Sequence, residues 1–176
     1  MNEATGAPKI ANLADLFAVA YRIEADAVER YELLADQMET HNNPELVAVF
    51  RDLCRAEKIH RDEIRRLAGD IDVVTHAQRL PNWGRGDSPE EVDLGAAHYM
   101  MTPWHALQMA LDGEKRALDF FTSIVETAKD SGIKRLAEEF AEEEAEHVNL
   151  VHRLLRRYPR PAESWSTDPD PPISQE

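Results

Sequence analysis

The stretch FAEEEAEHVNLV, Phe140 to Val151, places charged side chains where an amphipathic helix should be apolar. At helical spacing, Phe140, Val148 and Val151 form one apolar stripe, and Glu144 and His147 lie on that stripe. A surface helix turns its charges to the opposite face. The stretch therefore predicts a helix that buries a carboxylate and an imidazole, and the fold has to supply something that compensates them.

The 3.6-residue rhythm of amphipathic helices marks four segments, at residues 13–39, 44–69, 102–130 and 133–158. The first and last pairs are joined by short connections, which predict antiparallel hairpins. The connection over residues 70–101 contains LPNWGRGDSPEE, residues 80–91, which is interpreted as turns and loop. The connection is long enough to cross the whole bundle. These features predict an all-α four-helix bundle with one long crossover between the second and third helices.

The 176 residues suit one domain, which we expect to span residues 13–158. Residues 1–12 are interpreted as an N-terminal arm. Residues 159–176 are rich in proline and polar side chains, so we expect a disordered tail.

The bulk composition excludes several classes of protein. The chain has 34 acidic and 20 basic residues, a net charge of −14, which argues against binding to a nucleic-acid backbone. No stretch approaches the roughly 20 apolar residues of a membrane span, and the start lacks the pattern of a secretory signal. A single cysteine, Cys54, rules out an internal disulfide and a Cys-x-x-Cys metal module. We therefore expect a cytoplasmic protein.

Each predicted helix carries at least one ionisable residue on its apolar stripe. The second and fourth helices contain EKIH and EAEH, in which a Glu and a His three residues apart share one face. The first and third helices each contribute a lone Glu, and the distances from the two hairpin turns place all the groups at one height. The candidate metal ligands are Glu24, Glu57, His60, Glu114, Glu144 and His147.

Burying four carboxylates in one layer requires positive charge. An unpaired buried carboxylate costs several kcal/mol, and a domain is stable by only about 5–15 kcal/mol. On the sequence pattern, no Lys or Arg is expected on these stripes near the layer. Two divalent cations would balance four carboxylates and leave both imidazoles neutral, and the mixed ligands suit iron, manganese or zinc better than calcium.

At these residues the chain resembles the ferritin-like superfamily and, within it, the rubrerythrin-related proteins, over residues 13–158. The resemblance implies a site for two iron ions bridged by Glu57 and Glu144. The pair Glu24 and His60 would complete one iron, and the pair Glu114 and His147 the other. Tyr31 matches the family's site tyrosine, which hydrogen-bonds a metal-bound carboxylate.

The chain departs from rubrerythrins at two points. Rubrerythrins typically carry a second carboxylate three residues after the Glu of the third helix, where this chain has Ala117. Full-length rubrerythrins also bear a four-cysteine module that delivers electrons, which a chain with one cysteine lacks. Electrons are therefore expected from a separate donor protein.

These features predict a di-iron oxidoreductase that reduces hydrogen peroxide or dioxygen, as a peroxidase or a ferroxidase. Tyr31 is the catalytic residue expected beside the metal ligands. Related proteins commonly dimerise, so a homodimer is expected. Two alternatives stay open: an iron-binding or storage protein without catalytic turnover, and a metal-stabilised interaction protein whose tail binds a partner.

Overall fold

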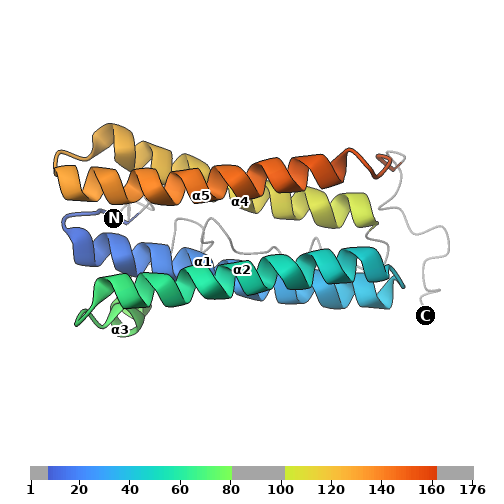
Figure 1. Ribbon diagram of the computed structural model, residues 1–176, viewed down its shortest axis with the longest axis horizontal. Coiled ribbons are helices and arrows are strands. Elements are labelled where there is room, and N and C mark those ends of the chain that lie inside the picture. Colours follow the sequence, from blue (N-terminus) through green and yellow to red (C-terminus); the bar gives the residue numbers. More distant parts are fainter. Residues whose placement is uncertain (1–7, 81–101, 162–176) are drawn as a thin grey trace, which may run out of the picture.

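The computed structural model describes residues 8–80 and 102–161, and within these ranges it contains five helices and no strand (Figure 1). The long helices are α1 (Leu13–Thr40), α2 (Pro44–Ala68), α4 (Pro103–Thr127) and α5 (Ser131–Leu155). The predicted all-α bundle is thereby confirmed. Most of the predicted arm and tail, residues 1–7 and 162–176, lies outside the described residues.

The long helices begin with residue types that are favoured at helix N-termini. The side-chain oxygens of Asn12, Asn43 and Asp130 accept backbone N–H groups in the first turns of α1, α2 and α5. Such caps satisfy donors that have no partner within the helix. Pro44 and Pro103 occupy first-turn positions of α2 and α4, where a missing N–H costs nothing.

The four long helices form two hairpins that lie side by side (Figure 1). One consists of α1 and α2 and the other of α4 and α5, and the helices pack most extensively within each hairpin. Figure 1 shows α2 and α4 running in the same direction, as a long crossover requires. Among the described residues, no helix combines the length and apolar character needed to cross a bilayer.

The crossover contains a short helix that the sequence analysis did not predict, α3 (Val73–Arg79). Asp72 caps it by accepting the backbone N–H of Thr75. Val73 and Ala77 are buried, and α3 packs against α1. These two buried side chains suffice to anchor two turns of helix. The stretch interpreted as turns and loop, residues 80–91, lies outside the described residues apart from Leu80.

The apolar core consists of two clusters. The α3-end cluster lies at the end of the bundle that contains α3, and the turn-end cluster lies at the end that contains the α1–α2 turn (Figure 1). Each cluster is built from all four long helices. The main side chains of the α3-end cluster are Leu16, Ile23, Ile64, Val73, Phe121 and Phe140. Those of the turn-end cluster are Val28, Leu34, Met38, Phe50, Leu107 and Val151.

Two leucines near helix ends are exposed. Leu13 is 41% exposed and Leu67 is 45% exposed. Both lie in terminal turns, and in the last turn of α2 the buried positions are taken by Ile64 and Ala68. Successive helical residues are rotated by about 100°, so Leu67 turns away from the face that Ala68 buries.

Candidate metal centre

A layer of buried carboxylates separates the two apolar clusters. Glu24, Glu57, Glu114 and Glu144 come from α1, α2, α4 and α5, and each is at most 5% exposed. Along each helix the Glu falls between residues of the α3-end cluster and residues of the turn-end cluster. The structure thus brings the predicted carboxylates to one height near the middle of the bundle.

His147 lies at the centre of this layer. Its Nδ1 atom is 3.2 Å from Glu57 Oε1, 3.4 Å from Glu114 Oε2 and 4.0 Å from Glu144 Oε2. His60 Nδ1 is 3.5 Å from Glu57 Oε2. Glu57, His60 and His147 form one group whose ligand atoms lie within 4.8 Å of one another, and Glu114, Glu144 and His147 form a second.

Glu24 belongs to neither of these two groups. It contacts Glu57, and burial together with the charge of Glu57 raises its pKa well above the usual value. The structure therefore gathers five of the six predicted ligands into two compact groups, with Glu24 beside the first. The assignment of all six as metal ligands stays a prediction.

The ionisation of the buried acids is uneven. Burial raises the pKa of Glu144, and the charges of Glu24 and Glu114 raise it further. Burial acts to raise the pKa of Glu114, but the charge of Arg30, the contact with His147 and the hydrogen bond from Tyr31 together outweigh burial and lower that pKa to about 2. Burial disfavours the charged form of His147, yet Glu114 and Glu57 raise its pKa to about 9. Protons thus occupy part of the layer at neutral pH.

Three atoms of the predicted ligands show what the layer lacks. Glu24 Oε2, Glu57 Oε1 and His147 Nδ1 are buried without a hydrogen-bond partner. Glu57 Oε1 and His147 Nδ1 lie 3.2 Å apart, within ion-pair distance but without a hydrogen bond. Buried polar atoms almost always have a hydrogen-bond partner. A cation bound among them would supply the missing interaction, so these residues fit a divalent cation that accepts oxygen and nitrogen ligands, such as iron, manganese or zinc.

The layer also contains a basic residue, Arg30 of α1, which is 2% exposed. Its Nη2 atom donates a hydrogen bond of 2.6 Å to Glu114 Oε1. The expectation that no Lys or Arg lies near the layer is therefore wrong. The signal was present in the sequence, because Ala27, Arg30 and Leu34 have the spacing of one helical face.

Tyr31 donates a hydrogen bond from its hydroxyl to the same Oε1 atom of Glu114. The tyrosine is fully buried, and burial and the charge of Glu114 raise its pKa well above the usual value. The Arg30 guanidinium carbon lies 4.5 Å from the centroid of the Tyr31 ring, a cation–π distance. The structure thus gives the implied site tyrosine a partner on the opposite hairpin, and its catalytic role stays a prediction.

Glu143 is a further acidic neighbour that the sequence analysis did not assign to the site. It is half-buried on α5, where burial raises its pKa and the charge of His60 opposes the rise. The His60 side chain is 23% exposed, against 12% for His147. The edge of the layer at His60 and Glu143 is therefore its more open side.

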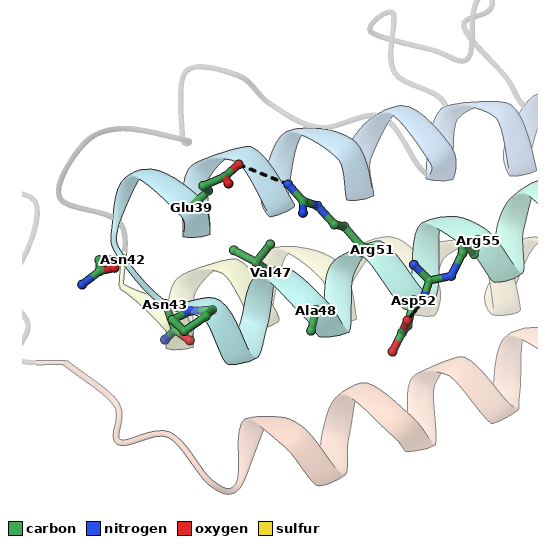
Figure 2. Close-up of a pocket in the computed structure, with 9 residues that line it drawn as sticks. Glu39, Asn42, Asn43, Val47, Ala48, Arg51, Asp52 and Arg55 are labelled. Carbon is green, nitrogen blue, oxygen red and sulfur yellow. Dashed lines mark hydrogen bonds and ion pairs between the residues drawn. The ribbon is translucent and has the colours of Figure 1, made fainter.

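A surface pocket of about 540 Å³ near the α1–α2 turn is separate from this layer (Figure 2). None of the six predicted ligands lines it. Its arginines are both paired with acids: Arg51 Nη2 lies 3.1 Å from Glu39 Oε2, as Figure 2 shows, and Arg55 contacts Asp52. The pocket carries no unpaired positive charge that would mark it as an anion site.

Comparisons with known proteins support the family and the fold of the chain. A family model described as Rubrerythrin matches residues 15–92, which include Glu24, Glu57 and His60. A solved structure of an uncharacterised conserved protein from Magnetospirillum magnetotacticum MS-1 is 37% identical to the chain, with a TM-score of 0.68. The alignment covers 86% of this chain and 98% of that one. No curated protein matches the chain.

Proposed function

The chain belongs to the rubrerythrin family of ferritin-like proteins, and from this premise we propose that it is a di-iron oxidoreductase that reduces hydrogen peroxide or dioxygen. The observation that carries the proposal is the buried layer of four carboxylates and two imidazoles, three of whose atoms have no hydrogen-bond partner. Bound iron would supply electrons to the oxidant and would recover them from a separate donor protein.

The residues of the layer have distinct roles in the proposed site. Glu57 and His60 would hold one iron, with Glu24 beside them, and Glu114, Glu144 and His147 would hold the other. Glu57 Oε1 lies only 3.2 Å from His147 Nδ1, so the two groups are close enough to hold a pair of cations. Paired-metal sites place their ions about 3.5–4 Å apart.

The surroundings of the layer suit chemistry with a small oxidant. The two apolar clusters exclude water from both ends of the bundle, which strengthens electrostatic interactions inside the site. The more open edge at His60 offers a route for a molecule as small as peroxide. The Tyr31 hydroxyl holds a proton at its oxygen next to Glu114, and the raised pKa keeps that proton in place at neutral pH.

Anaerobic titration with Fe²⁺, followed by hydrogen peroxide or dioxygen, tests this proposal. We expect two irons per chain and a near-ultraviolet absorption from the oxidised pair. Glu144→Gln should lower the iron stoichiometry, whereas Glu142→Gln, at an exposed position two residues away, should leave it unchanged. An unchanged stoichiometry and oxidation rate in Glu144→Gln would refute the site.

The same experiment separates the enzyme from the storage alternative. Repeated turnover of peroxide with an added reductant supports the oxidoreductase. Two irons that are oxidised once, without further turnover, support iron binding or storage instead. Light scattering on the loaded protein then distinguishes the expected dimer from a larger assembly.

A further inference from the structure

One oxygen of Glu114 is held by two donors from the opposite hairpin. Arg30 Nη2 and the Tyr31 hydroxyl, both on α1, donate to Glu114 Oε1 on α4, and we call these two residues the donor pair. Only Oε2 is left to face the layer, where it lies 3.4 Å from His147 Nδ1. Glu114 can therefore offer a cation one oxygen.

Glu24, the counterpart of Glu114 in the other hairpin, contacts another carboxylate, Glu57, in place of a basic donor. Its Oε2 atom is buried without a hydrogen-bond partner. The donor pair follows Glu24 by six and seven residues, whereas the residues at those positions after Glu114 are Phe120 and Phe121. A phenyl ring neither donates a conventional hydrogen bond nor carries a charge. The two halves of the layer are thus chemically unequal.

The balance of positive and negative charge also differs between the two halves of the layer. Arg30 is the only buried Lys or Arg within residues 8–80 and 102–161, and its side chain and that of Glu114 are both 1% exposed. Its positive charge offsets the negative charge of Glu114, to which it hydrogen-bonds, and acts more weakly on Glu57. A guanidinium repels a dication strongly where water is excluded.

We propose that Arg30 is a positioning residue that makes the two cation positions unequal. It restricts Glu114 to ligation through one oxygen, and its charge makes the position at Glu114 and Glu144 the second to fill. The inference rests on the proposed function, because it requires a site for two cations. Arg30 thereby determines which of the two cation positions fills first.

Calorimetric titration of the metal-free chain with Zn²⁺ tests the proposal. The unaltered protein should bind two ions, the second at least about tenfold more weakly than the first. Arg30→Gln removes the charge and should tighten the second step by about tenfold or more. A second step that is unchanged or weakened in Arg30→Gln would overturn the inference.

Two control variants separate charge from a merely structural role. Arg30→Lys keeps the positive charge and should keep the unequal steps. Arg51→Gln alters an exposed arginine of the same hairpin, which pairs with Glu39, and should leave both steps unchanged. If Arg30→Lys instead behaves like Arg30→Gln, the charge argument is wrong.

A measurement on the unaltered protein covers the case in which Arg30→Gln does not fold. The Nε resonance of a buried arginine can be followed by ¹⁵N NMR and assigned to Arg30 by its loss in Arg30→Lys. It should stay in place during the first equivalent of Zn²⁺ and shift during the second. A shift complete at the first equivalent would overturn the proposal.

The outcomes distinguish this inference from the function on which it rests. Fewer than two bound Zn²⁺ in the unaltered protein would contradict both the paired-metal site and the role of Arg30. Two ions bound with equal affinity would remove only the role of Arg30 and leave the paired-metal site standing.

Discussion

The imidazole rings of His60 and His147 stack across the two hairpins, with their centroids 5.3 Å apart and their planes 13° from parallel. His60 belongs to α2 and His147 to α5. Two protonated rings at this separation would repel each other, so the arrangement favours at most one imidazolium. Cation binding, which requires neutral imidazoles, is therefore linked to the protons that the layer holds.

Metal binding should release protons at neutral pH. The contacts of His147 with Glu114 and Glu57 raise its pKa to about 9, so His147 is protonated at pH 7 in the metal-free protein. The pKa values of Glu24 and Glu144 are raised as well. A cation must displace these protons, so affinity should increase as the pH rises from 7 to about 9 and then level off.

Calorimetry in two buffers of different ionisation enthalpy measures this release. The heat of Zn²⁺ binding at pH 7 should differ between the buffers by the equivalent of at least one proton. Equal heats in both buffers would show that the ligands are already deprotonated.

Breaking the buried pair of Arg30 and Glu114 should destabilise the metal-free protein. Arg30→Met leaves a buried carboxylate without its guanidinium, a loss that typically costs about 3–5 kcal/mol. The double variant Arg30→Met with Glu114→Gln removes both charges and should recover much of that loss. Urea denaturation in the presence of a chelator measures the free energy of unfolding.

Arg55→Met provides the matched control for this pair. Arg55 contacts Asp52 on the exposed surface of α2, and exposed pairs contribute about 0–1 kcal/mol. A loss in Arg30→Met as small as that in Arg55→Met would contradict the buried ion pair.

Tyr31→Phe should lower the stability of the protein without lowering the number of irons that it binds. The change removes one hydrogen bond to an ionised carboxylate, which is worth about 1.5–3 kcal/mol, while Arg30 still donates to Glu114. The free energy of unfolding should fall by that amount, and the iron stoichiometry should stay at two. Loss of an iron in Tyr31→Phe would mean that the hydroxyl contributes to binding directly.

Phe121→Ala should separate the stability of the core from metal binding. Phe121 is fully buried in the α3-end cluster, and truncating a core phenylalanine typically costs about 3–5 kcal/mol. Leu67→Ala, at an exposed position, should change stability by less than about 0.5 kcal/mol. Both variants should bind two irons when folded, as measured by anaerobic titration.

Helical periodicity predicted the bundle and its buried acids for a physical reason. A stripe of apolar residues fixes which face of a helix is buried, so a charge on that stripe, such as Glu144, must enter the core. The short helix α3 was missed because two buried residues, Val73 and Ala77, make too short a pattern to recognise. Arg30 was missed although its spacing matched the stripe, because a long basic side chain on such a face usually extends to solvent.

Contacts between the hairpins could not be predicted from spacing. The sequence places Tyr31 and Glu114 at suitable heights, but the rotation of α1 relative to α4 decides that they meet. The same rotation places Glu24 beside Glu57 and outside the two compact groups. Periodicity fixes the face and height of a side chain, whereas the pairing of individual oxygen atoms depends on how whole helices pack.

The division of the core into the α3-end cluster and the turn-end cluster has a consequence for how the chain opens. In most helical bundles, amide exchange is fastest at the frayed helix ends and slowest at mid-helix. Here the middle of every long helix carries a buried carboxylate that packs less favourably than an apolar side chain, so the metal-free chain should lose protection at mid-helix first. Proteases that cut at such openings would then tie the lifetime of the protein to the supply of metal.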